Sequence, residues 1–328
     1  MQFNEAQQEA VDFYQGPCLT LAGPGSGKTA VITHRTKNLI EKYGVSPSEI
    51  LVVTFTKAAA MEMKERFLSL TNQTSTTATF GTFHAVFFTV LKYAYHYRAE
   101  NIIRDEQKVV FIRNLLRHFP IDYEDENECI QTLLSEISGV KNSNIPIEHY
   151  YSSNFPEHTF RDVFMNYQKM LQKNRLIDFD DMLVYTYELF SQRKDILALW
   201  QKKFRYILID EFQDINGLQY EIIRMLAAPE NNLFVVGDDD QSIYRFRQAR
   251  PEIMLNFEKD YADAKRIVLN YNYRSDGNIV AAAGRLIAHN TGRFAKDIKA
   301  FHPAKEAVVC KTYRTQREEN LGLIHALK

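Results

Sequence analysis

A short apolar run that breaks into glycines and ends in Gly-Lys-Thr has the pattern of a phosphate-binding loop. The run is Leu19 to Leu21, and the loop residues are Ala22, Gly23, Pro24, Gly25, Ser26, Gly27, Lys28 and Thr29. The glycines let the backbone turn its N–H groups toward an anion, and the helical pattern from Thr29 to Lys42 directs its positive N-terminus at the same point. In such loops the lysine reaches the β- and γ-phosphates and the threonine hydroxyl ligates Mg²⁺. A glycine-rich turn without a ligand is the alternative, but strand, Gly-Lys-Thr and helix follow in the order that phosphate binding requires.

Two adjacent carboxylates, Asp210 and Glu211, follow a second apolar run, Tyr206 to Ile209. In open α/β sheets, ligands bind where the carboxyl ends of parallel strands meet. We therefore predict that Asp210 holds the metal and that Glu211 is the general base that polarises the attacking water. An acidic strand end is common by chance, and it becomes informative only together with the phosphate loop.

A third apolar run, Leu233 to Gly237, ends in Asp238, Asp239, Asp240 and Gln241. Three carboxylates beside a nucleotide phosphate would repel it, so most of them must point elsewhere or cap the following helix. Gln241 is uncharged and long, and it is the predicted hydrogen-bond partner of the γ-phosphate or of its attacking water.

Aromatic and cationic residues alternate just downstream, in Tyr244-Arg245-Phe246-Arg247-Gln248. This alternation suits a platform for single-stranded nucleic acid, because bases stack on the rings while arginine meets phosphate. On the pattern alone, an ordinary amphipathic face explains the segment equally well.

These candidate residues need a parallel sheet to bring them together. Short β-rich runs alternate with amphipathic helices, which is the pattern of an α/β sheet covered on both faces. The expected strands are 19–21, 50–55, 76–80, 206–210, 233–237 and 266–269, and the expected early helices are 4–14, 29–42 and 58–70. From 85 to 203 helical periodicity dominates, with expected helices at 106–118, 128–138, 159–171 and 179–190. The sequence therefore predicts a parallel sheet interrupted by an all-helical insertion.

Length and composition exclude several classes of protein. With 328 residues the chain can hold two domains, and 40 basic against 41 acidic residues leave a net charge of -1. Any nucleic-acid site must then be a local patch. Cys18, Cys129 and Cys310 lack metal-site spacing, which favours free thiols in a reducing compartment. The polar N-terminus is no signal peptide, and no apolar run approaches the roughly 20 residues of a membrane span. We expect a soluble, cytoplasmic protein.

Eight short motifs occur in one order along the chain. They are Phe3-Asn4 with Gln7 and Ala10-Val11; Ala22 to Thr29; Thr54-Phe55-Thr56 with Ala58-Ala59; Gly81-Thr82-Phe83-His84; Asp178-Phe179-Asp180-Asp181; Asp210-Glu211-Phe212-Gln213-Asp214; Gly237-Asp238 with Asp240-Gln241-Ser242-Ile243-Tyr244; and Asn272-Tyr273-Arg274-Ser275. Together they resemble the UvrD/Rep/PcrA family of superfamily 1 DNA helicases. The resemblance extends from about residue 3 to about residue 290.

The resemblance implies a fold and a division into domains. It implies an α/β, RecA-like P-loop NTPase domain in two parts, 1–84 and 204–280, with the all-helical domain 85–203 inserted between them. Residues 281–328 would lead toward a second motor lobe that this chain does not contain.

The resemblance also implies roles for single residues. Gln7 would read the adenine edge, Tyr273 would stack on the base, and Arg274 would contact the γ-phosphate, which Gln241 would sense. Ala30, directly after Gly-Lys-Thr, would join the nucleotide-binding loop. The single-stranded DNA track would comprise Thr56, Thr82, Phe83, His84 and Phe246. Alone, His84 could equally be a packing histidine and Tyr273 a core aromatic. We interpret Asp178 to Asp181 as structural, because Asp178 can cap a helix and Asp181 suits its first turn.

The function that the resemblance implies is ATP hydrolysis with Mg²⁺, coupled to 3′ to 5′ movement on single-stranded DNA and to unwinding at duplex junctions. This chain alone is not expected to unwind DNA, because unwinding needs the second lobe. The oligomeric state stays open. A P-loop ATPase that does not translocate and a DNA-binding module regulated by nucleotide are the alternatives. ATP turnover with and without single-stranded DNA separates the three.

Overall fold

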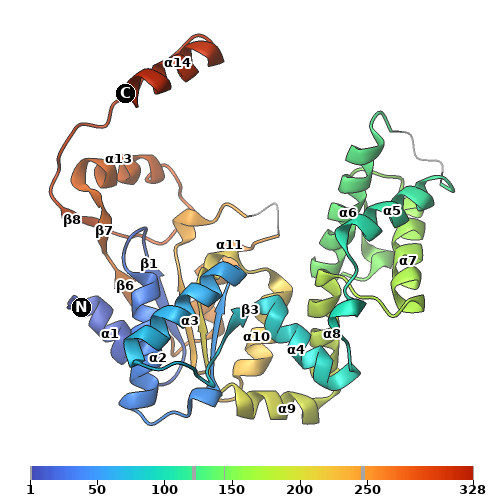
Figure 1. Ribbon diagram of the computed structural model, residues 1–328, viewed down its shortest axis with the longest axis horizontal. Helices are drawn as coiled ribbons and strands as arrows, with labels where there is room; N and C mark the ends of the chain where they lie inside the picture. The colour runs from blue at the N-terminus through green and yellow to red at the C-terminus, as the bar shows by residue number, and fades with distance from the viewer. Residues whose placement is uncertain (1, 120–122, 144, 245–247, 328) are drawn as a thin grey trace. The chain divides into compact units, whose positions relative to one another are not determined.

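The computed structural model describes residues 2–119, 123–143, 145–244 and 248–327 (Figure 1). The chain forms two compact units. The larger comprises residues 1–22 and 27–269, and the smaller comprises residues 23–26 and 270–328. Among the described residues, no helix is long and apolar enough to cross a membrane. Cys18, Cys129 and Cys310 form no disulfide with one another.

The larger unit is built on a six-stranded parallel sheet in the order β3-β2-β4-β5-β1-β6. The strands are β1 (Cys18–Ala22), β2 (Ile50–Thr54), β3 (Thr79–Thr82), β4 (Tyr206–Ile209), β5 (Leu233–Gly237) and β6 (Lys265–Leu269). The predicted strand 76–80 is displaced, because Ala78 N donates to Thr76 Oγ1 at 3.1 Å and this turn delays the strand to Thr79. The α/β class and the parallel sheet that the sequence predicts are confirmed.

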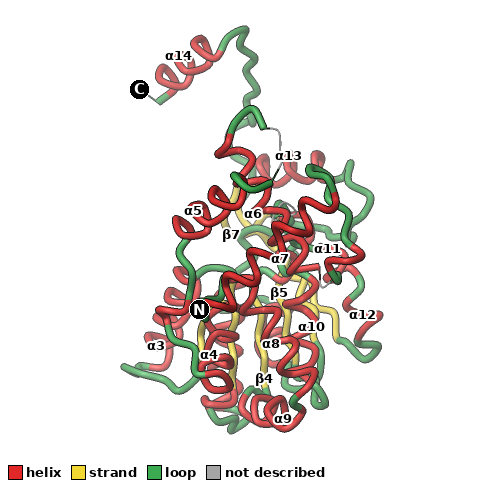
Figure 2. The backbone as a smooth tube through the Cα atoms, turned by 90° about the vertical axis from the view of Figure 1, so that its right-hand side faces the viewer, coloured by secondary structure: helices red, strands yellow, loops and turns green. Residues whose placement is uncertain are grey.

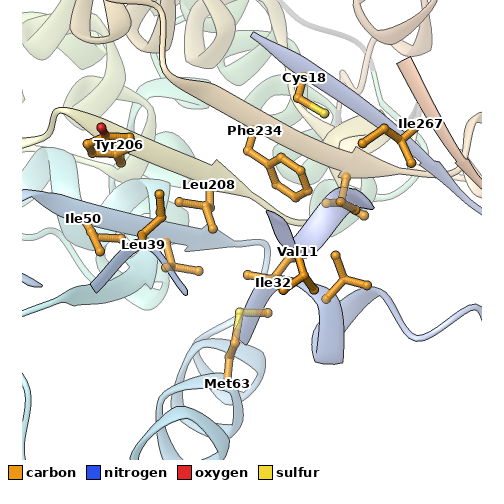
Figure 3. Close-up of a cluster of buried hydrophobic side chains, with 14 of the residues drawn as sticks. Val11, Cys18, Ile32, Leu39, Ile50, Met63, Tyr206, Leu208, Phe234 and Ile267 are labelled. Carbon is orange, nitrogen blue, oxygen red and sulfur yellow. The ribbon is translucent and has the colours of Figure 1, made fainter. Parts of the chain in front are cut away.

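One face of the sheet packs against α1 (Glu5–Asp12), α2 (Lys28–Glu41) and α3 (Lys57–Thr71). Figure 3 shows side chains of this core, which joins Val11 and Ile32 of the helices to strand residues such as Leu208 and Phe234. Apolar strand positions alternate between this core and the opposite face, because the side-chain period of a strand is two. Asn4 caps α1, and the helix ends at Asp12, two residues before the predicted end.

The described residues between 83 and 203 form mainly helices. Its elements are α4 (Phe83–Tyr95), η2 (Ala99–Asn101), α5 (Asp105–Leu116), α6 (Glu126–Ser143), η3 (Ile147–His149), α7 (Glu157–Lys173), α8 (Phe179–Gln192) and α9 (Lys194–Lys203). Helices α5, α6 and α7 share a hydrophobic core separate from that of the sheet (Figure 1). Helix α6 runs five residues beyond its predicted end at Ser138. The other predicted helices of this segment are present, with ends shifted by one or two residues.

Helix α8 is one of the contacts between these helices and the sheet layer. It packs against α4, α6 and α10 (Gly217–Ala227), and Figure 2 shows α8 and α10 in front of the strands. The remaining elements of the larger unit are η1 (Pro47–Glu49), η4 (Phe212–Asp214), η5 (Asp239–Gln241), α11 (Pro251–Leu255) and α12 (Phe257–Asp260).

The smaller unit holds a two-stranded parallel sheet, β7 (Tyr271–Asp276) with β8 (Lys299–His302), and the helices α13 (Gly277–Ile287) and α14 (Gln316–Ala326). Residues 23–26 belong to this unit, and Gly25 O accepts a hydrogen bond from Tyr273 N at 2.9 Å.

Candidate nucleotide and DNA sites

The predicted phosphate loop connects β1, which ends at Ala22, to α2, which begins at Lys28. Gly25 and Gly27 have φ of 66° and 85°, in the left-handed region that favours glycine. A Cβ on Gly25 would lie 2.6 Å from Arg274 Cβ, and one on Gly27 would lie 2.9 Å from Gln7 Nε2. Within the described residues no side chain caps the N-terminus of α2. The loop is therefore shaped as the sequence predicts, and the first N–H groups of α2 can meet an anion.

Lys28, the first residue of α2, forms an ion pair with Glu211. Its Nζ lies 2.8 Å from Glu211 Oε2. Glu211 follows β4 with φ of 52°, a left-handed conformation that is costly for a residue with a side chain. Burial raises the pKa of Glu211, but the charge of Lys28 and hydrogen bonds from Gln213 and Lys28 outweigh it and hold the pKa below its usual value. The predicted base and the predicted phosphate-binding lysine are thus in direct contact.

At the neighbouring carboxylates, burial and like charge outweigh the compensating charge of Lys28. Asp210 is 7% exposed, and burial together with the charge of Glu211 raises its pKa to about 6. Burial and the same charge raise the pKa of Asp214 to about 6, and within the described structure its Oδ1 has no hydrogen-bond partner. Three carboxylates with a single ammonium leave an excess of negative charge that a divalent cation would neutralise. Asp210 and the Thr29 hydroxyl are suitable ligands for Mg²⁺.

Gln213 links this acidic cluster to Gln241, and its role is not visible in the sequence. Its Nε2 donates to Glu211 Oε2 at 2.9 Å, and its Oε1 accepts from Asp238 N at 3.0 Å. Gln241 Nε2 donates to Asp238 Oδ2 at 2.7 Å. A Cβ on Gly237 would lie 2.6 Å from Gln213 Oε1, so the glycine makes room for this connection. The position of Gln213 two residues after the carboxylate pair was the only available signal.

The other predicted nucleotide residues fall in both units. In the larger unit, Gln7 is buried, and its Oε1 accepts from Asn4 N at 3.1 Å as part of the α1 capping box. In the smaller unit, the Tyr273 ring lies 4.8 Å from that of Phe301, and the exposed Arg274 follows it. Their roles toward ATP stay predictions.

The predicted DNA-track residues lie at the beginnings of two helices. Thr56 caps α3, accepting from Ala59 N at 3.1 Å, and Thr82 caps α4, accepting from Ala85 N at 3.3 Å. Phe83 is only 3% exposed, so it can support the track but offers little surface to a base. Phe246 lies outside the described residues.

Three further aromatic residues surround this region: Phe55, Phe179 of the segment interpreted as structural, and Tyr244 of the predicted nucleic-acid platform. The His84 ring meets that of Phe179 edge-on at 5.6 Å, and burial lowers the pKa of His84. Phe179 is 48% exposed, although it follows the helix cap Asp178 that the sequence predicts. The rings of Phe55 and Tyr244 stack at 5.3 Å.

A cavity of about 390 Å³ brings several of these residues together. Its lining includes Phe55, Thr82, Phe83, His84, Phe179 and Asp214. The cavity combines aromatic rings with polar side chains, and Asp214 extends it to the carboxylates that follow β4. Such a surface can accept nucleobases.

Comparison with known proteins agrees with this arrangement. The family model of the UvrD/REP helicase N-terminal domain matches residues 3–262. The putative ATP-dependent DNA helicase YjcD of Bacillus subtilis is 41% identical over 306 residues, which cover 90% of this chain and 40% of that protein. The ATP-dependent DNA helicase PcrA of Bacillus subtilis is 38% identical over 325 residues, 97% of this chain and 43% of that protein. The chain thus spans less than half the length of these relatives. The family resemblance predicted from the sequence is confirmed, and the chain belongs to the UvrD/REP helicase family.

Proposed function

We propose that this chain is the ATP-binding part of an ATP-dependent DNA helicase that hydrolyses ATP to move 3′ to 5′ along single-stranded DNA and to unwind duplex. The observation that carries the proposal is the ion pair between Lys28 at the end of the glycine loop and Glu211, beside the buried Asp210. The relatives' names, ATP-dependent DNA helicase, support it.

The ion pair indicates how the site responds to nucleotide. Lys28 would exchange Glu211 for the β- and γ-phosphates, which releases one oxygen of Glu211 toward the attacking water. Gln213 would then hold the released carboxylate in place. Mg²⁺, held by Thr29 and Asp210, would neutralise charge that develops on the phosphates.

The cavity beside α4 and α8 supports single-stranded DNA as the second ligand. Phe55, Phe179 and Tyr244 join the predicted track, because each presents an aromatic ring in the same region as His84. The net charge of -1 implies that stacking contributes much of the affinity.

The proposal includes the organisation of the whole protein. Residues 1–84 and 204–280 form the RecA-like ATPase domain, residues 85–203 the helical insertion, and residues 281–328 the connection toward a second motor lobe. Cytoplasmic localisation is part of the proposal and agrees with three cysteines that form no disulfide with one another.

ATP turnover measured with and without single-stranded DNA tests the function. Strong stimulation by DNA supports the motor. Turnover that is indifferent to DNA supports a plain P-loop ATPase, and DNA binding without turnover supports a regulated binding module.

Replacing Gln213 with leucine tests its part in hydrolysis. Gln213→Leu removes a hydrogen bond to a charged group, which contributes about 1.5 to 3 kcal/mol, and kcat is expected to fall about 10- to 100-fold. KM for ATP should change little, because the side chain of Gln213 bonds to Glu211, Asp214 and Asp238 N and not to the phosphate loop. Gln201→Leu is the matched control, since Gln201 donates to a backbone carbonyl, that of Met225, instead of to Glu211. An unchanged kcat would exclude Gln213 from the site.

Replacing Phe179 with alanine tests the DNA track. Base stacking contributes about 1 to 3 kcal/mol per ring, so Phe179→Ala should weaken binding of a labelled oligonucleotide about 5- to 150-fold in fluorescence anisotropy. ATP affinity should be retained. Tyr151→Ala is the control, because Tyr151 is an exposed aromatic of the helical segment that does not line the cavity. Equal losses in both variants would contradict the assignment.

A further inference from the structure

A buried ionic cluster joins α6 to α8. Lys141 Nζ lies 2.6 Å from Asp178 Oδ2 and 2.7 Å from Asp181 Oδ1, and all three side chains are at most 4% exposed. Tyr167 donates a further hydrogen bond to Asp178 Oδ2 at 3.0 Å. Buried charges are tolerated only with such close pairing, and removal of one partner is costly. The cluster therefore fixes the last turn of α6 against the first turn of α8.

The residue after Lys141 extends the cluster out of the helical segment. Asn142 Nδ2 donates to Asp180 Oδ1 at 2.6 Å, and Asn142 Oδ1 accepts from Asn216 Nδ2 at 3.0 Å. Asn142 and Asn216 are each 8% exposed. The carboxylate of Asp180 accepts, so the amide nitrogen of Asn142 must face it and the amide oxygen must face Asn216.

The side chain of Asn216 makes a further hydrogen bond through its amide oxygen. It caps α10, with its Oδ1 accepting from Gln219 N at 2.8 Å. It follows the 3₁₀ turn Phe212–Asp214, which continues directly from Glu211. The side chain of Asn216 therefore connects the segment that carries the carboxylates to α6, and through Asn142 to α8.

The connection runs along the DNA cavity, because Asn142, Asn216 and Asp180 are among the residues that line it. Asp180 is the second residue of α8, directly after Phe179, whose ring lies beside His84. A shift of the segment 211–216 on nucleotide binding would thus move or release the first turn of α8. The hydrogen bonds are buried, and breaking one leaves an amide or carboxylate unsatisfied.

We propose that Asn142 is a positioning residue that couples nucleotide binding to single-stranded DNA binding, by joining Asn216 to Asp180. The proposal rests on the proposed function, since it requires that both ligands bind. It assigns a role to buried polar groups that the hydrolysis mechanism does not use. The coupling is reciprocal, so nucleotide changes DNA affinity by the same factor by which DNA changes nucleotide affinity.

The test measures this factor directly. The Kd of a labelled oligo(dT) is measured by fluorescence anisotropy without nucleotide and with a saturating non-hydrolysable ATP analogue and Mg²⁺. The ratio of the two Kd values in the unmodified protein is expected to differ from one by at least about fivefold. Asn142→Ala should bring the ratio to within about twofold of one. Because Asn142 also lines the cavity, the ratio of the two Kd values, and not the Kd of the oligonucleotide alone, is the readout.

A second variant tests the same connection in case Asn142→Ala does not fold. Asn216→Asp keeps an oxygen that caps α10 but removes the donor to Asn142, and aspartate is as good an N-cap as asparagine. It should lose coupling as Asn142→Ala does. Asn174→Ala is the control, because Asn174 Nδ2 donates to the carbonyl four residues earlier, as Asn142 Nδ2 also does, but has no link to Asn216.

The possible results separate the two proposals. Loss of coupling in Asn142→Ala and Asn216→Asp, with coupling retained in Asn174→Ala, supports the role of Asn142. The role of Asn142 is wrong if a folded Asn216→Asp protein keeps the Kd ratio of the unmodified protein. It is also wrong if the unmodified protein itself has a ratio of one. Neither result affects the proposed function. Failure of the unmodified protein to bind either ligand overturns both.

Discussion

Glu211→Gln is expected to lower ATP turnover by at least about a hundredfold, because glutamine cannot accept the proton of the attacking water and general-base catalysis contributes about 10² to 10⁴ in rate. Nucleotide affinity should be retained or should rise. Glutamine has the size of glutamate, and loss of the negative charge frees Lys28, now 2.8 Å from Glu211, for the phosphates.

Steady-state turnover and a titration with a fluorescent nucleotide check this expectation together. Glu221→Gln is the matched control, since Glu221 on α10 is an exposed glutamate paired with Arg224 at 3.4 Å and not with Lys28. Turnover close to that of the unmodified protein would mean that another carboxylate, with Asp214 the nearest candidate, is the base.

The environment of Glu211 gives this prediction a further physical basis. The charge of Lys28 holds the pKa of Glu211 below its usual value while the two are paired. If Lys28 turns to phosphate as proposed, part of that effect would be lost and the pKa of Glu211 would rise. The carboxylate would then be a better proton acceptor when the substrate is in place.

The candidate hydrolytic residues stand out in the sequence because they are close to elements with clear patterns, and their roles stay predictions. Lys28 follows glycines and begins a helix, and Asp210 and Glu211 directly follow an apolar strand. Parallel pairing of β4 with β5 and of β5 with β1 then brings the strand ends to one edge of the sheet. The family model and the relatives confirm the class of protein that these patterns indicate.

The residues that sequence reasoning missed depend on conformation or on distant contacts. Gln213 reaches Glu211 because Glu211 adopts a left-handed conformation, which no periodicity reveals. The contact of Phe179 with His84 joins segments almost a hundred residues apart in sequence. Helix α6 continues past Ser138 because Lys141 and Asn142, polar residues typical of a helix end, have buried partners.

Lys28→Ala is expected to have an effect as large as that of Glu211→Gln but of a different kind. The ammonium would supply charge to the β- and γ-phosphates in both the bound and the transition state, so both affinity and rate should fall. A loss of several kcal/mol of transition-state stabilisation lowers kcat/KM by at least about a hundredfold, at about 1.4 kcal/mol per tenfold.

The same substitution leaves Asp210, Glu211 and Asp214 without the cation of Lys28, and their mutual repulsion would further oppose phosphate binding.

Lys37→Ala on the same helix is the control, since Lys37 lies 3.7 Å from Glu41 and not near the carboxylates of β4. Nucleotide titration and turnover measured on both variants decide between two explanations of the ion pair. If Lys28→Ala matches Lys37→Ala in affinity and rate, the Lys28–Glu211 pair is only structural and the phosphate-binding role is wrong. If both quantities fall in Lys28→Ala alone, while Glu211→Gln loses rate but keeps affinity, the two partners of the ion pair have the separate roles in binding and hydrolysis that the proposal requires.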